Sequence, residues 1–151
     1  MLRFHLASRL PSTLSKEDVA HVARQMTKAL HLKRTNVIYV TFATERAMQE
    51  VNKRTRGNAH ATDVLSFATA EEMRRVTPRD TEVDLGEIMI CATYAAKEAR
   101  RRSIDVREEL MRLLIHGVLH IQGYDHAKEK EEAKMFALQE RLVAEIVESD
   151  V

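Results

Sequence analysis

The hydrophobic positions of this chain follow two different periods. Runs rich in β-branched and aromatic residues predict strands at residues 2–6, 36–43, 63–69 and 85–91. Apolar residues spaced three and four apart predict helices at residues 15–30, 44–51, 93–102, 106–122 and 128–147. Ser15 and Thr44 are suited to cap the first two helices, and Asp18 can complete a capping box with Ser15. Residues 71–82 are polar and contain Pro78, so we expect a loop there.

This order of elements, β α β α β β α α α, predicts a single α+β domain over residues 1–151. A mixed sheet of about four strands would be covered by about five helices. We expect the second and third strands to run parallel through a right-handed crossover. The length of 151 residues and the composition, 44% hydrophobic and 31% charged, fit an ordinary globular domain with a sizeable core.

The net charge and the lengths of the apolar runs limit the kinds of partner that we expect. Lys and Arg number 24 against 23 acidic residues, so the net charge of +1 gives no bulk attraction for nucleic acid, and a polyanion partner needs a local basic cluster. No apolar run reaches the ~20 residues that span a bilayer, and the N-terminal residues lack the apolar stretch of a signal peptide. The single cysteine, Cys91, excludes an intramolecular disulfide. We therefore expect a cytoplasmic protein with no membrane partner.

Three clusters of basic residues could form such a patch. They are Lys53, Arg54 and Arg56; Arg74, Arg75 and Arg79; and Lys97, Arg100, Arg101, Arg102 and Arg107. Most charge runs of this kind are simply solvated faces of helices and loops.

The chemistry is concentrated in residues 116–126, which read HGVLHIQGYDH. His116 and His120 are four residues apart on a predicted helix, so their Cβ atoms lie about 5–6 Å apart on one face. Gly123 can take the left-handed conformation that ends a helix, which lets His126 fold back toward the pair. A lone histidine on an apolar helix is more often hydrogen-bonded in a core, but this spacing favours His116, His120 and His126 as ligands of one metal ion.

Three imidazole ligands leave the fourth position of a tetrahedral zinc ion open to water or substrate, as in catalytic sites. The predicted cofactor is one Zn²⁺ ion, although manganese, nickel or iron could occupy the same ligands. The spacing HxxxHxxGxxH is also that of metzincin proteases, whose second residue is a glutamate that acts as general base. Here that residue is Gly117, so peptidase chemistry would lack its main proton acceptor.

Three segments, in the same order, resemble those of the YbeY-type endoribonucleases, a family of bacterial rRNA maturation factors. They are HGVLHIQGYDH, the stretch NKRTRGNAHATDVLSF at residues 52–67, and LGEIMIC at residues 85–91. The resemblance implies a zinc-dependent endoribonuclease that is specific for single-stranded RNA. It also implies roles in 3′-end maturation of 16S rRNA and in ribosome quality control, with RNA and the ribosome as partners.

The resemblance also implies roles for single residues. His116, His120 and His126 align with the metal ligands, and Arg56 aligns with the arginine that holds the substrate phosphate. Arg56 and His116 are the predicted catalytic residues. A guanidinium can bind phosphate through two parallel hydrogen bonds and offset the charge that grows during attack. Without the resemblance, Arg56 would be taken for an exposed loop arginine.

The loop before the third strand departs from the family pattern YRGKDxPTDVLSFP. A lysine and two prolines of that pattern are missing, and the differing positions are Thr55, Asn58, Ala59, Ala61 and Ala68. We therefore expect a loop that is less stiff than usual.

The sequence does not identify the proton acceptor of the implied cleavage reaction. A metal-bound hydroxide could serve, or Glu87 if its strand faces the site. Asp125 could orient a metal ligand or simply form a turn beside Gly123. The attacking group could be water or the ribose 2′-hydroxyl.

Two other functions compete with RNA cleavage. One is a peptidase-like zinc hydrolase that uses a different base. The other is a ribosome-binding factor without catalytic activity, in which the metal only stabilises the fold.

Overall fold

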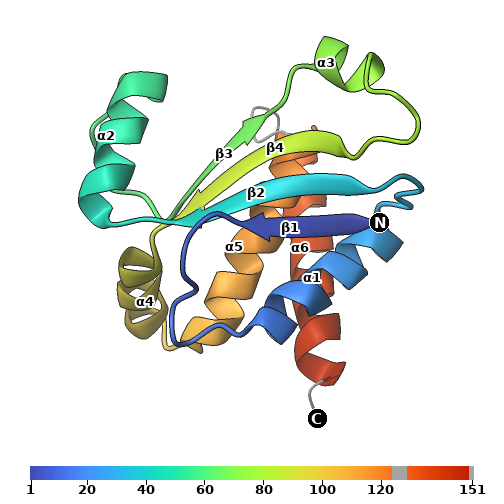
Figure 1. The fold of residues 1–151 in the computed structure, drawn as a ribbon. Coiled ribbons are helices and arrows are strands. Elements are labelled where there is room, and N and C mark those ends of the chain that lie inside the picture. The colour runs from blue at the N-terminus through green and yellow to red at the C-terminus, as the bar shows by residue number, and fades with distance from the viewer. Residues whose placement is uncertain (124–128, 150–151) are drawn as a thin grey trace.

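The computed structural model of the chain describes residues 1–123 and 129–149, which are organised around a four-stranded sheet (Figure 1). The strands are β1 (Leu2–Leu6), β2 (Asn36–Phe42), β3 (Val64–Ala68) and β4 (Val83–Ile90). The helices are α1 (Lys16–Ala29), α2 (Glu45–Arg56), α3 (Glu71–Arg75), α4 (Ala92–Arg101), α5 (Val106–Ile121) and α6 (Glu129–Ser149). The predicted α+β class and mixed sheet are confirmed.

The strand order is β1-β2-β4-β3, which corrects one prediction about topology. β1, β2 and β4 are parallel, whereas β3 runs antiparallel to β4 at the edge of the sheet. The second and third strands are therefore neither neighbours nor parallel. Burial explains the order, because β4 carries buried residues along its length and suits the interior of the sheet, while β3 is mostly half-buried.

Helices α1, α5 and α6 pack together on one face of the sheet, and α5 lies against β3 and β4 (Figure 1). The main core fills the space between these helices and the strands. Its largest fully buried side chains include Met26, Ile38, Ile88, Leu114 and Met135. Among the described residues, no helix combines the length and the apolar character that crossing a bilayer requires.

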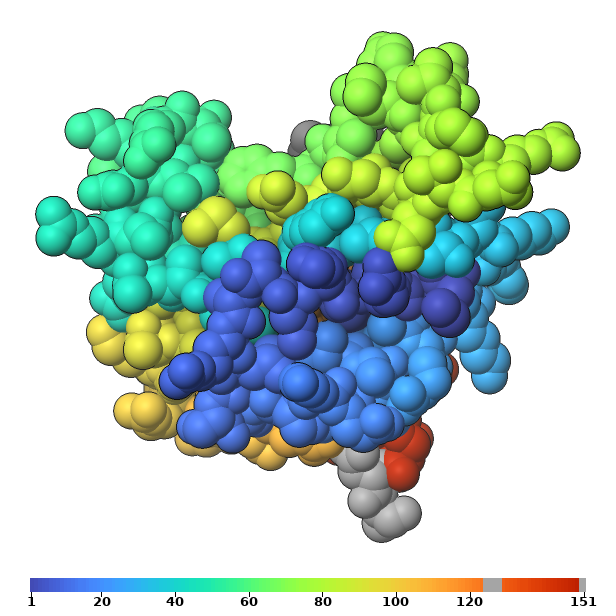
Figure 2. Space-filling view, in the orientation of Figure 1, coloured from blue at the N-terminus to red at the C-terminus, as the bar shows by residue number. Residues whose placement is uncertain are grey.

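The opposite face of the sheet is open at its centre, between α2 and α3 (Figures 1 and 2). Tyr39 on this face is 38% exposed, and Glu87 is exposed as well. Only a small second cluster, made by Met48, Leu65 and Cys91 with their neighbours, packs beneath α2.

Both predicted helix caps are present. The Ser15 hydroxyl accepts a hydrogen bond from the Asp18 amide, and the Asp18 carboxylate accepts one from the Ser15 amide, which completes the capping box. The Thr44 hydroxyl accepts from the Ala47 amide. The boundaries of most other elements differ from prediction by only one or two residues.

Two helices differ from the prediction. Residues 71–75 form α3 within the predicted loop, and this short helix buries no residue, so no hydrophobic period marks it. The Arg74 side chain nevertheless anchors α3 by donating hydrogen bonds to the carbonyls of Leu85 and Ile121. The second difference is that α2 continues to Arg56, where Gly57 ends it with φ +69°.

Candidate active site

Helix α5 is held tightly against the sheet at the position of Gly117. A Cβ atom at this position would lie 2.7 Å from Cδ1 and 2.9 Å from Cγ1 of the buried Ile88 on β4. Glycine therefore allows the helix to approach the strand closely. A glutamate at this position would face the core instead of the solvent, so the base of the metzincin pattern could not be placed here.

His116 and His120 are half-buried on the exposed side of the same helix. Their ring centroids are 5.3 Å apart, with an angle of 46° between the ring planes. Two imidazoles that bind one tetrahedral zinc through bonds of about 2 Å have centroids about 5 Å apart, so the pair fits a shared metal ion. Gly123 ends the helical run with φ +96°, as predicted.

The third predicted ligand, His126, lies outside the described residues, as does Asp125. Within residues 1–123 and 129–149, no three His, Cys, Asp or Glu side chains gather closely enough to hold a metal. The described residues thus supply two histidines of the predicted ligand set, and the role of His126 stays a prediction.

Arg56 reaches the site from the other side of the sheet. It stands in the last turn of α2, its Nη2 donates to the Ser66 carbonyl at 3.0 Å, and its guanidinium lies 5.5 Å from the centre of the Phe67 ring. None of the ion pairs between described residues includes Arg56, unlike Arg54, which has Glu50 3.8 Å away. Its charge is therefore available to an anion.

Arg56 and the two histidines line one cavity of about 230 Å³ at the edge of the sheet, next to β3. Val64 and Ser66 share the strand face that meets α5, whereas Leu65 and Phe67 belong to the cluster beneath α2. The edge strand thus separates the two helices, and the cavity opens where both reach past it. The structure brings together Arg56, His116 and His120, and their roles in catalysis, phosphate binding and metal binding stay predictions. The remaining lining residues are Asn52, Thr62, Val64, Leu65 and Ser66.

Asn52 fixes the loop between α2 and β3. Its buried side chain donates to the His60 carbonyl at 3.1 Å, and the Asn58 side chain accepts from the His60 amide. The first of these hydrogen bonds ties the loop to α2, and the second forms a local turn within the loop.

The carboxyl group of Asp63, just before β3, lies within electrostatic range of His116. Burial raises the pKa of Asp63, while the nearby charge of His116 acts in the opposite direction. In the sequence, Asp63 is only the first residue of the predicted strand 63–69. Its proximity to His116 depends on how β3 lies on α5, which no local pattern shows.

Glu87 does not serve as the base in this geometry. Ile88 packs against Gly117 of α5, so the preceding residue on the strand points to the opposite face of the sheet. Glu87 is exposed there and lies beside Phe67 of β3. Glu87 was proposed only if its strand faces the site, and the direction of β4 turns it away from the histidines of α5.

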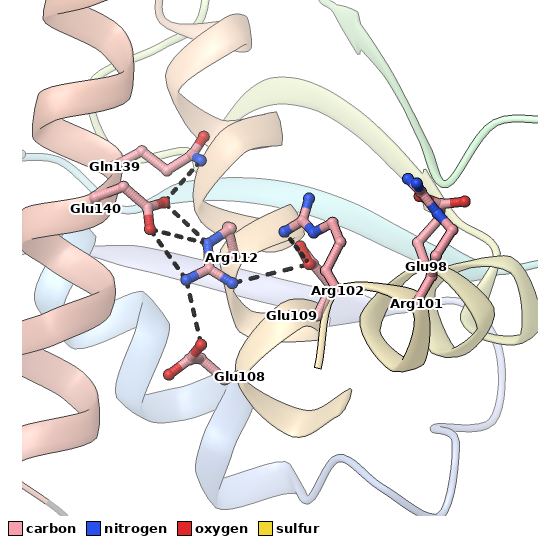
Figure 3. Close-up of polar contacts among 8 residues, drawn as sticks. All are labelled: Glu98, Arg101, Arg102, Glu108, Glu109, Arg112, Gln139 and Glu140. Carbon is pink, nitrogen blue, oxygen red and sulfur yellow. Dashed lines mark hydrogen bonds and ion pairs between the residues drawn. The ribbon is translucent and has the colours of Figure 1, made fainter. Parts of the chain in front are cut away.

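The third basic cluster of the sequence is largely neutralised. Arg101 pairs with Glu98, Arg102 pairs with Glu109, and Lys97 pairs with Glu45 (Figure 3 shows the arginine pairs). This part of the surface is thus a network of ion pairs.

One further residue, Gln139 of α6, was not predicted, and its Oε1 lies 2.8 Å from Nδ1 of His116. Gln139 is buried on the apolar stripe of α6, beside Met135 and Leu142. From the helical period of residues 128–147 we expected an apolar stripe of Met135, Leu138, Leu142 and Ile146, but Leu138 is only half-buried and Gln139 takes the buried position. The sequence did contain a signal for Gln139, because a polar residue at a core position of a helix usually has a hydrogen-bond partner.

The model of one protein family, Endoribonuclease YbeY, matches residues 7–147 of the chain. The chain belongs to the endoribonuclease YbeY family. Endoribonuclease YbeY of Persephonella marina is 40% identical over 118 residues, which cover 77% of this chain and 74% of that protein. Endoribonuclease YbeY of Beutenbergia cavernae is 34% identical and covers 91% of this chain and 93% of the relative.

The fold agrees with membership of the YbeY family. The solution structure of TM1509 from Thermotoga maritima superposes with a TM-score of 0.61 at 25% identity, covering 97% of this chain and 89% of that one. The family match includes α2, β3 and α5, which build the cavity.

Proposed function

We propose that this YbeY family member is a zinc-dependent endoribonuclease that cleaves single-stranded RNA. We further propose that it acts on the 3′ end of 16S rRNA and in ribosome quality control, in contact with the ribosome. One observation supports the chemistry above the others: a guanidinium and two imidazoles from opposite sides of the sheet line the same cavity. This pairing suits a phosphodiester, which needs charge stabilisation on its oxygens.

The proposed roles in metal binding and phosphate binding fall on two helices, α5 and α2. His116 and His120 of α5 would hold the metal, with His126 as the proposed third ligand. When bound, the metal supplies a Lewis acid for a phosphate oxygen and lowers the pKa of water. Arg56 would bind the phosphate and keep it at the cavity mouth, because its guanidinium already points there from α2.

The central experiment measures cleavage of a single-stranded RNA by purified protein, with and without a chelator, for four proteins. These are the wild type, His120→Ala, Arg56→Ala, and Lys53→Ala as a control for an exposed positive charge on the same helix. We expect the chelator and His120→Ala to abolish cleavage. Arg56→Ala should slow it by about 100-fold or more, because an oriented charge is lost, and Lys53→Ala should change it little.

The competing functions predict different results. Full cleavage by a folded, metal-free His120→Ala protein would exclude metal-dependent chemistry at this site. A peptidase-like hydrolase would cleave peptides, and that activity would survive Arg56→Ala. A metal-stabilised ribosome-binding factor would lose its thermal stability with the chelator but show no cleavage with any variant.

Two further measurements define the reaction. Analysis of the products distinguishes the nucleophile, because a 2′,3′-cyclic phosphate would exclude direct attack by water. Metal analysis of untreated protein identifies the ion, and we expect one zinc per chain.

A further inference from the structure

Helix α6 contributes a buried amide to the candidate metal site. Gln139 is only 4% exposed, and its Oε1 lies 2.8 Å from Nδ1 of His116 on the neighbouring helix α5. An imidazole nitrogen and an amide oxygen at this distance form a hydrogen bond. The direction of that bond determines which ring nitrogen of His116 carries the proton.

Glu140 fixes the orientation of the Gln139 amide (Figure 3). The Gln139 Nε2 group donates to Oε2 of Glu140 at 3.1 Å. Burial raises the pKa of Glu140, but hydrogen bonds from Arg112 and Gln139 outweigh it and keep the pKa below its ordinary value. The carboxylate is therefore ionised and can only accept, so the amide must turn its nitrogen toward Glu140 and its oxygen toward His116.

Arg112 holds Glu140 in place from α5. Its Nε and Nη2 donate to the two carboxylate oxygens at 2.9 and 3.0 Å, which is the paired geometry of a guanidinium with a carboxylate. The Arg112 side chain is 14% exposed and also contacts Glu108 at 3.3 Å. Because Arg112 lies one helical turn before His116, the polar chain starts and ends on the metal helix.

We propose that Gln139 is a positioning residue that sets the tautomer and ring orientation of His116, and that Arg112 and Glu140 orient Gln139 for this task. An amide oxygen accepts, so Nδ1 of His116 donates its proton, and Nε2 carries the lone pair that a metal ion needs. This inference rests on the metal site of the proposed function. A neutral amide also avoids placing a second carboxylate beside Glu140.

The first test observes the tautomer directly. Long-range proton–nitrogen NMR spectra of the metal-free protein are recorded near pH 8, above the ordinary imidazole pKa of about 6.5. Assignment of His116 comes from a His116→Asn variant. We expect the Nδ1–H form in the wild type and a shift toward the Nε2–H form in Gln139→Leu. Persistence of the Nδ1–H form in Gln139→Leu would overturn the proposal.

The second test measures Zn²⁺ affinity by competition with a chelating dye. We expect Gln139→Leu to weaken binding by about 10- to 100-fold, as loss of a partner that orients a ligand does. Glu140→Gln should weaken binding less, because the new amide permits Gln139 to turn. Leu142→Ala is the packing control: it removes a buried side chain from the same helix and should lower stability without changing Zn²⁺ affinity.

These results separate the inference from the proposed function. If the wild type binds Zn²⁺ with Nδ1–H on His116 but cleaves no RNA, the endoribonuclease proposal fails and the role of Gln139 stands. If Gln139→Leu binds Zn²⁺ within about twofold of the wild type, the role of Gln139 is wrong whatever the RNA result. Equal losses of Zn²⁺ affinity in Gln139→Leu and Leu142→Ala would mean that Gln139 acts only through packing.

Discussion

The two sides of the candidate active site are built very differently. Helix α5, which carries His116 and His120, buries ten of its sixteen residues and is tied to α1, α6 and the sheet. Helix α2, which carries Arg56, buries only Met48 and Asn52 and stands at the edge of the open face (Figure 1). One half of the site belongs to the main core, and the other half is attached to it.

This difference in packing suits the two proposed tasks, which are metal binding by α5 and phosphate binding by α2. A metal site needs ligands held to a fraction of an ångström, which packing and a buried polar chain can provide. A flexible RNA backbone is better received by a side chain that can adjust, and α2 has few buried contacts that would prevent a small movement. The candidate site thus combines a rigid half, which carries two proposed metal ligands, with a loosely packed half, which carries the proposed phosphate-binding arginine.

The largest expected effect tests the rigid half. Gly117→Glu introduces the glutamate of the metzincin pattern, but the new side chain would enter the core against Ile88. We expect a loss of about 3–5 kcal/mol in the free energy of unfolding, because a charge is buried without a partner. Urea denaturation measures this loss. The control Gln49→Glu, at an exposed position on α2, should change stability by less than about 0.5 kcal/mol.

A peptidase activity gained by a stable Gly117→Glu protein would contradict this account. It would show that position 117 can face the metal, and that the close contact between α5 and β4 is not required.

Gly117→Ala tests the same contact with a single methyl group. Alanine gains about 1 kcal/mol in helix propensity, but the overlap with Ile88 costs about 1–3 kcal/mol. We expect a net destabilisation in the wild-type background and a net stabilisation in an Ile88→Ala background, where the space is free. A double-mutant cycle measures the coupling between the two positions, and simple additivity would show that the strand yields to the methyl group.

The sequence predicts the rigid half well because that half rests on local patterns. The histidine spacing, the helical period of α5 and the glycine that ends it all lie within one stretch of chain, and the structure places them as expected. The direction of Glu87 and the place of β3 beside β4 could not be predicted. They depend on which strand takes the interior position of the sheet, a competition among distant segments.

The phosphate-binding role of Arg56 was assigned by resemblance. The local pattern alone put Arg56 in a loop, and the structure shows why. Its helix continues past Val51, because Lys53, Arg54 and Arg56 are good helix formers and Gly57 supplies the stop. Gln139 was hidden for a different reason. Its role requires that α6 turn one particular face to His116, and the predicted apolar stripe contained Leu138 where the structure buries Gln139.

The anchoring of α5 at its N-terminal end gives a smaller, pH-dependent effect. Hydrogen bonds from Arg107 lower the pKa of Asp18 from 3.8 to about 2, despite the opposing effect of burial. Because the folded pKa lies below the unfolded one, this stabilisation is complete above about pH 5 and disappears as the pH falls through about 2. We expect Asp18→Asn to cost about 1–2 kcal/mol at pH 7, a value reduced for the partial exposure of Arg107.

Urea denaturation of Asp18→Asn and Arg107→Gln between pH 7 and pH 2 checks this expectation. The difference from the wild type should shrink with falling pH in both variants. A difference that stays constant over this range would mean that the pair contributes through packing rather than charge.

The smallest effect distinguishes the attached half from the core half. Thr44→Ala removes the cap of α2 and should cost about 1 kcal/mol, which raises the local opening of that helix about fivefold. Native-state hydrogen exchange should therefore become faster in α2 and stay unchanged in α5. Ser15→Ala, which removes the cap of α1, is the matched control and should instead lower the stability of the whole domain, because α1 packs on the main core. Equal acceleration in α2 and α5 after Thr44→Ala would mean that both halves of the site open together, and the proposed division into a rigid and an adaptable half would be wrong.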